Sequence, residues 1–134
     1  MSPTALRGAL GFLTRLPVGR DEATWEAFVQ SPATFPVVGY LVGALVALPF
    51  LLPAPAPTVA LAFPVAVYAA TGITHLDGVA DLGDAAVVHG DAAARRAVLK
   101  DSALGVGGTV ALVAVVLGLA TAAFALAEAA VSTG

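Results

Sequence analysis

Cysteine is absent from this chain of 134 residues, and charged side chains are scarce. Without cysteine there is neither a disulfide framework nor a thiolate metal site, and the redox compartment stays undetermined. Only 11% of the residues are charged whereas 59% are hydrophobic, and the mean hydropathy is +0.94. The surface of a soluble domain does not tolerate this balance. The composition therefore predicts a chain that lies in a lipid bilayer, with spanning segments in place of a soluble core.

No charged side chain occurs between Glu26 and Asp77, and a second long apolar stretch follows near the C-terminus. The spans expected from these stretches are residues 35–52, 58–74 and 106–127. Each is close to the length that crosses a hydrocarbon core of about 30 Å. The sequence "PAPAP" separates the first two, because consecutive prolines cannot donate backbone hydrogen bonds to a continuing helix. We therefore expect an all-α, multi-pass helical membrane protein with about three spanning helices, in which residues 1–134 form a single membrane domain.

Residues 1–34 precede the first span and mix apolar with charged side chains. Four leucines lie near helical spacing in this region: Leu6, Leu10, Leu13 and Leu16. This amphipathic pattern predicts an N-terminal helix at the membrane interface. A signal peptide is the alternative, but Arg15 and Pro17 interrupt its hydrophobic region. Residues 21–30 predict a second, short helix with aromatic side chains at the level of the headgroups.

The cationic side chains all lie outside the expected spans: Arg7, Arg15, Arg20, Arg95, Arg96 and Lys100. Three of them precede the first span and three lie between the second and the third. With three spans, both groups face the same side of the membrane, and the positive-inside rule assigns that side to the cytoplasm. We therefore expect a multi-pass protein of the cell membrane, with a polar loop at residues 75–105 that faces the cytoplasm.

Three aspartates occur in the sequence "HLDGVADLGDAA", which opens this loop. Asp77, Asp81 and Asp84 stand at i, i+4 and i+7, so they project from one face if the preceding helix continues. Three like charges beside lipid repel one another unless a cation neutralises them, and carboxylate oxygens with phosphate or water suit Mg²⁺ or Mn²⁺. Zinc is disfavoured because His75 is out of register with Asp77 and no HExxH pair occurs. The plainer alternative is that these aspartates only solubilise a helix end.

Basic side chains follow in "DAAARRAVLKDSALGVGG", residues 91–108, which predicts a short helix capped by Asp91. Its three cations either pair with the aspartates or bind the phosphate groups of an anionic substrate. The glycine-rich "LGVGG" offers backbone amides that could approach a phosphate at the start of the third span. The nucleotide fingerprints G-x-G-x-x-G and G-x-x-x-x-G-K-[ST] are absent, so no nucleotide-binding fold follows. We expect no nucleic-acid partner.

Four blocks carry a resemblance to a known family: "FLTRLPV" at 12–18, "FPVVGYLVG" at 35–43, "GITHLDGVADLGDA" at 72–85 and "RRAVLKDSALGVGG" at 95–108. Together they resemble the N-terminal portion of the cobalamin synthase family, the adenosylcobinamide-GDP ribazoletransferases. The acidic block is the most specific element. The resemblance implies a multi-pass membrane enzyme that joins α-ribazole or its 5′-phosphate to adenosylcobinamide-GDP, with release of GMP and with Mg²⁺ as cofactor.

The resemblance also assigns roles position by position. Metal binding falls on the acidic motif: Asp77, Asp81 and Asp84. The later block of the family falls on Lys100, Asp101 and Ser102. For the chemistry, we expect Asp101 or one of the three motif aspartates to accept the hydroxyl proton, with His75 as the weaker candidate. The expected substrate-binding residues are Arg95, Arg96, Lys100 and Ser102. Family members usually carry arginine where this chain has Ala103, and they are considerably longer, so the chain is expected to be incomplete relative to the family.

Two other classes of function remain open. A membrane alcohol phosphotransferase acting on a lipid-linked nucleotide uses the same aspartate chemistry. A divalent-cation transporter also needs intramembrane carboxylates, but here the acids lie in the loop and not at mid-span. A shortened, inactive chain is a third, non-enzymatic reading. Besides the two substrates and the lipid bilayer, the partners considered are a second copy of the chain and other membrane proteins of the corrinoid pathway.

Overall fold

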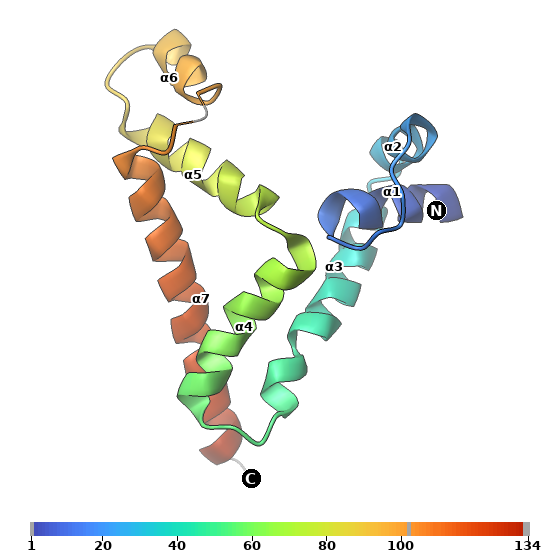
Figure 1. Cartoon of the computed structure of the whole chain (residues 1–134), viewed down its shortest axis with the longest axis vertical. Helices are drawn as coiled ribbons and strands as arrows, with labels where there is room; N and C mark the ends of the chain where they lie inside the picture. Colours follow the sequence, from blue (N-terminus) through green and yellow to red (C-terminus); the bar gives the residue numbers. More distant parts are fainter. Residues whose placement is uncertain (1, 102, 133–134) are drawn as a thin grey trace. The chain divides into compact units, whose positions relative to one another are not determined.

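The computed structural model describes residues 2–101 and 103–132. Every regular element within those residues is helical, which agrees with the expected all-α class. The chain divides into two compact units, Met1–Gly72 and Ile73–Gly134. Figure 1 colours the first from blue to green and the second from yellow to red. Each unit is built around helices whose capping and length follow from the local sequence.

The first unit opens with two short helices, α1 (Pro3–Leu13) and α2 (Glu22–Val29). Helix α1 begins where the Ser2 hydroxyl accepts a hydrogen bond from the N–H of Ala5 at 3.1 Å, with a proline at its first position. Helix α2 begins at a capping box, in which Asp21 accepts from the N–H of Thr24 at 2.8 Å. The short helix expected at residues 21–30 is therefore confirmed, and the place of its aromatic side chains at the headgroups stays a prediction.

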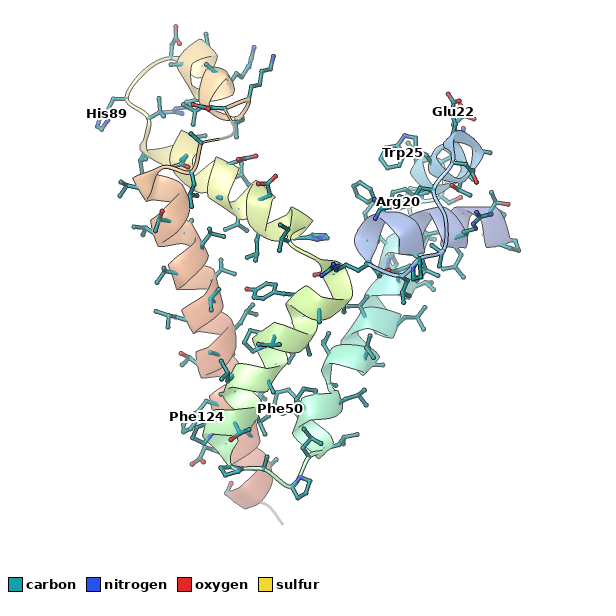
Figure 2. All side chains as sticks on the ribbon, viewed as in Figure 1. Arg20, Glu22, Trp25, Phe50, His89 and Phe124 are labelled. Atoms are coloured by element: carbon teal, nitrogen blue, oxygen red, sulfur yellow. The ribbon has the colours of Figure 1, made fainter. Side chains whose placement is uncertain are left out.

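The leucine face of α1 packs inward. A small core of Ala9, Phe28 and Val38 is covered by partly buried side chains: Leu6, Leu10, Leu13 and Val42. Helix α2 approaches α1 closely at Gly8, where a Cβ atom would lie 2.9 Å from the Cβ of Phe28. Figure 2 shows Trp25 and Glu22 on α2, and the Trp25 ring lies 5.7 Å from the ring of Phe28. The amphipathic pattern of α1 thus produces this core. The placement of α1 at the membrane interface stays a prediction.

Helix α3 (Thr34–Val46) continues through the 3-10 turn η1 (Leu48–Leu51) and ends at the prolines. After this turn, α4 (Ala56–Thr71) returns along α3 (Figure 1). The stretch Thr34–Leu51, with a mean hydropathy of 2.0, has the length and composition of a membrane span. The stretch expected at 35–52 is therefore helical and apolar enough to span, and its crossing of a membrane stays a prediction.

The second expected span, 58–74, is longer than the helix that forms. Helix α4 has 16 residues and ends before Gly72, whose φ of 76° and ψ of −173° are incompatible with helix. Within the described residues, two helices are long and apolar enough to cross a membrane, or three if α4 and the next helix count as one interrupted span. The helix over this stretch therefore ends three residues before the predicted position 74, and the span itself stays a prediction.

The second unit contains α5 (Thr74–Val87), α6 (Ala92–Val98) and α7 (Val106–Ser132). Helix α7 includes the stretch Val106–Ala130, whose length and mean hydropathy of 2.6 suit the span expected at 106–127. The region expected as a polar loop, 75–105, is largely helical because α5 and α6 occupy most of it. Asp91 caps α6 as expected: its carboxylate accepts from two backbone N–H groups at 3.0 Å.

Candidate functional site

Helices α5 and α7 contact each other through residues with little or no side chain (Figure 1). A Cβ atom added to Gly83 would lie 2.6 Å from the Cβ of Ala111 and 2.7 Å from the carbonyl oxygen of Gly107. At Gly108, a Cβ atom would lie 2.8 Å from the carbonyl oxygen of Ala80. Small residues allow this approach of two backbones, as they do between helices in membranes. The start of α7 is thereby held against the middle of α5.

Asp84 lies at this crossing, and 9% of its surface is exposed. Among the charged side chains of residues 2–101 and 103–132, it is the buried one. Its Oδ2 accepts a hydrogen bond from the N–H of Gly105, and its Oδ1 accepts one from the N–H of Gly108, both at 2.8 Å. The first N–H groups of a helix lack intrahelical partners, and the helix dipole favours an anion there. The negative charge of Asp84 is therefore compensated by the start of α7.

A pocket of about 260 Å³ opens beside this contact. Its lining comes from α5 and from the segment that leads into α7: Asp77, Ala80, Asp81, Asp84, Leu99, Lys100, Asp101, Ala103 and Leu104. The three aspartates of the acidic motif thus face a common cavity, as their register on one helix face predicts. Lys100 and Asp101 line the same cavity from the segment between α6 and α7. The pocket holds four carboxylates and one ammonium group, so it favours a cation.

The carboxylates of the pocket are not gathered into a ready metal cage. Within the described part of the chain, no three acidic or histidine side chains lie close enough together to hold a metal ion. Asp84 directs both its oxygens to α7. Mg²⁺ is commonly held by one or two carboxylates together with water and substrate phosphates, so two aspartates are an adequate protein contribution. The oxygen donors of Asp77 and Asp81 fit this chemistry, and the metal site stays a prediction.

The remaining predicted residues lie outside the pocket lining. His75 is exposed in the first turn of α5, and Arg95 and Arg96 are exposed on α6. Figure 2 shows His89 on the connection between α5 and α6, with its exposed ring directed away from the helices. Ser102, which the sequence predicts to bind substrate, is not among the described residues.

Sequence reasoning missed the partners of Asp84. The glycine-rich "LGVGG" was expected to offer its amides to a phosphate, yet two of these amides donate to Asp84. The signal that could have indicated this is the glycine at the position before α7, because a helix that begins at glycine lacks a capping side chain of its own. Sequence reasoning also missed Leu99 and Leu104, which together with two alanines form the apolar part of the pocket lining.

Apolar helices of spanning length and a carboxylate-lined pocket at the start of one of them define a helical protein of the membrane class. Residues 5–133 match the family model described as cobalamin-5-phosphate synthase. The chain belongs to this family, and the resemblance noted from its four sequence blocks is confirmed.

Several relatives carry the name adenosylcobinamide-GDP ribazoletransferase. The protein of Halorubrum lacusprofundi is 77% identical over 131 residues, which are 98% of this chain and 51% of that protein. The protein of Haloquadratum walsbyi is 49% identical over 87% of this chain and 48% of its own length. That of Pyrobaculum islandicum is 40% identical over 81% of this chain and 44% of its own length. The chain spans about half the length of these curated relatives. No solved structure matches it.

Proposed function

We propose that this chain supplies the acidic pocket of an adenosylcobinamide-GDP ribazoletransferase of the cell membrane, with the pocket on the cytoplasmic side. The observation that carries the proposal is the pocket itself, in which the acidic motif of α5 faces Lys100 and Asp101. The names of the relatives support the choice of substrates, adenosylcobinamide-GDP and α-ribazole or its 5′-phosphate. Besides the substrates and the lipid bilayer, the partners that we propose are a second copy of the chain or another membrane protein of the same pathway.

The reaction transfers a phosphoryl group between two oxygen atoms. A hydroxyl oxygen of α-ribazole attacks the phosphorus next to cobinamide, a new O–P bond forms, and the bond from that phosphorus to the bridging oxygen breaks. GMP leaves with the bridging oxygen, and the hydroxyl proton passes to a base. Because negative charge develops on the transferred and departing phosphates, catalysis needs cationic groups near both.

The residues of the pocket have the chemistry for these roles. Asp101 lies at the rim and is exposed, so it is the proposed acceptor of the hydroxyl proton. His75 is the weaker candidate because it is not part of the pocket lining. Lys100 is the proposed partner of the diphosphate, since an ammonium group binds phosphate as a point charge. Arg95 and Arg96 are exposed on α6, and in this proposal they contact the phosphate that leaves with GMP.

Asp77 and Asp81 would hold Mg²⁺ together with the substrate phosphates. The bound ion would supply charge neutralisation on the diphosphate. Their carboxylates need such a partner because both face the same cavity and repel each other. Of the alternatives, a cation transporter is disfavoured because these acids lie on α5, outside the two helices that reach spanning length by themselves. A different alcohol phosphotransferase finds no support in the names of the relatives.

The test measures GMP release from adenosylcobinamide-GDP and α-ribazole by the purified chain in lipid vesicles, with Mg²⁺ and with a chelator. We expect release to require Mg²⁺ and to fall by about 10²–10³-fold in Asp77→Asn and Asp81→Asn, the usual loss when charge stabilisation at a reacting group is removed. Asp91→Asn is the matched control, because this aspartate caps α6 and does not line the pocket.

Unchanged GMP release in both pocket variants would refute the metal role. Absence of release together with Mg²⁺ flux across the vesicles would favour transport. Complementation of a strain blocked at this step, by this chain compared with a longer relative, shows whether the pocket works without further segments.

A further inference from the structure

The start of α7 lacks the side chains with which a helix normally caps itself. The carbonyl oxygen of Gly105 accepts the first intrahelical hydrogen bond, from the N–H of Thr109 at 3.0 Å, so Gly105 occupies the N-cap position. The third helical residue is Gly108. A capping box needs a polar side chain at each of these two positions, and both are glycine. The long apolar helix therefore begins with N–H groups that require an acceptor from elsewhere.

Asp84 provides that acceptor from a different helix. One of its oxygens takes the N–H of the N-cap residue Gly105, and the other takes the N–H of Gly108. These are the two N–H groups that a capping box satisfies, and here a single carboxylate satisfies both. The three atoms nearest to a Cβ atom at Gly105 would all belong to the carboxylate of Asp84, so the glycine makes room for this contact.

This contact also joins the two ends of the segment from Asp84 to Gly105, and part of that segment lines the pocket beside α5 as its second wall. Asp84 and Gly105 are 21 residues apart, and the residues between them include Leu99, Lys100 and Asp101. We propose that Asp84 is a positioning residue: it caps α7 from α5 and so fixes Lys100 and Asp101 opposite Asp77 and Asp81. This inference deepens the proposed function and rests on it for the roles of those four residues.

Ligation of a metal by Asp84 competes with this role. Both its oxygens already accept hydrogen bonds at 2.8 Å, and only 9% of the residue is exposed. A metal would have to reach the remaining lone pairs of a largely buried carboxylate and would compete with the start of α7 for its negative charge. Asparagine cannot replace the aspartate, because its NH₂ group is a donor and would face one of the two N–H groups. The contact therefore requires a carboxylate even when no metal is present.

The test compares Asp84→Ala and Asp84→Asn with Asp77→Asn and the control Asp91→Asn, with the chain in detergent micelles. Amide hydrogen exchange at Gly105 and Gly108 reports the cap, trypsin cleavage after Lys100 reports the second wall, and Mn²⁺ titration reports metal binding. In both Asp84 variants we expect exchange at the two glycines and cleavage after Lys100 to rise about tenfold or more. Mn²⁺ affinity should change less than in Asp77→Asn, and Asp91→Asn should leave exchange at both glycines unchanged.

A double variant separates capping from positioning. In Asp84→Ala with Gly105→Ser, the space left by the carboxylate admits the new side chain, and the serine hydroxyl can accept from the N–H of Gly108. We expect exchange protection at Gly108 to recover while cleavage after Lys100 stays high, because the serine caps α7 without tying it to α5. Recovery of both would show that Asp84 acts only as a cap.

The inference is overturned if Asp84→Asn keeps slow exchange at Gly105 and Gly108, or if it loses Mn²⁺ binding as fully as Asp77→Asn with exchange unchanged. Failure of the proposed function gives a different result. In that case Asp77→Asn does not alter Mn²⁺ binding, whereas the exchange and cleavage effects of the Asp84 variants persist.

Discussion

Replacing Gly83 by alanine tests the contact between α5 and α7 on which the pocket depends. The new Cβ atom would lie 2.6 Å from the Cβ of Ala111, whereas ordinary contact begins at about 3.4 Å. It would also lie 2.7 Å from the carbonyl oxygen of Gly107. Neither atom is at the end of a flexible side chain, so no rotation relieves the clash. The two helices must therefore separate by about 0.8 Å at this point.

The separation also affects Asp84, which follows Gly83 directly. Its two hydrogen bonds of 2.8 Å would lengthen toward about 3.6 Å, beyond hydrogen-bond reach. Overpacking costs about 1–3 kcal/mol, and a hydrogen bond to a charged group contributes about 1.5–3 kcal/mol. Alanine returns up to about 1 kcal/mol because it favours helix more than glycine does. We expect the free energy of unfolding of the Ile73–Gly134 unit to fall by about 2–4 kcal/mol.

The measurement is the unfolding of the chain in detergent micelles, followed by circular dichroism. Gly118→Ala is the matched control, because it lies on α7 as well and a Cβ atom there meets nothing within 4 Å. This variant should be as stable as the parent chain or more stable by up to about 1 kcal/mol. If Gly83→Ala unfolds at the same temperature as Gly118→Ala, the backbones are not in close contact and the reasoning fails.

Three further predictions concern other parts of the chain. Gly72→Ala should destabilise the first unit by about 1–3 kcal/mol, since the φ of 76° and ψ of −173° of Gly72 are almost exclusive to glycine. The control Gly39→Ala should not lower the melting temperature, because a Cβ atom at Gly39 meets nothing within 4 Å. Hydrogen bonds from the backbone and side chain of Thr24 lower the pKa of Asp21 below its ordinary 3.8. The contribution of Asp21 to stability should therefore be complete above pH 3.8 and be lost as the pH falls through the lowered pKa. An NMR titration, with Asp21→Ser as control, checks the sign. Lys100→Met should weaken binding of inorganic pyrophosphate in the presence of Mn²⁺ by about tenfold, as measured by calorimetry. The control Arg20→Met, an exposed residue of the Met1–Gly72 unit that does not line the pocket, should weaken it by less than about twofold.

Hydropathy closely predicted the long apolar helices of the first and third expected spans, because a helix in lipid must be apolar over its whole length. It did not predict where the helix of the second expected span ends. The residues from Gly72 to Thr74 are as apolar or small as those before them, so composition shows no boundary there. The helix ends because Gly72 adopts a left-handed φ, and glycine in a membrane protein is equally common inside spanning helices. Conformation at a single residue therefore decided what the apolar pattern could not.

The acidic pocket was predictable because it depends on one periodicity. Asp77, Asp81 and Asp84 fall on one helix face whatever surrounds them, and the structure places all three at a common cavity. The partner of Asp84 was not predictable in this way. Its hydrogen bonds join residues 21 and 24 positions apart, and a local pattern holds no information about which helix end approaches α5. The glycines of "LGVGG" indicated close backbone contact but not the group that makes it.

The charge balance of the pocket changes once Asp84 has its own partner. The sequence argument required one divalent cation to neutralise three carboxylates beside lipid. In the structure, two backbone N–H groups and the dipole of α7 compensate Asp84 without any cation. Only Asp77 and Asp81 then need the proposed Mg²⁺, and two carboxylates balance its charge. The diphosphate would bring further negative charge, and in the proposed function Lys100 would offset it, so its cation would serve substrate binding and not the stability of the empty pocket.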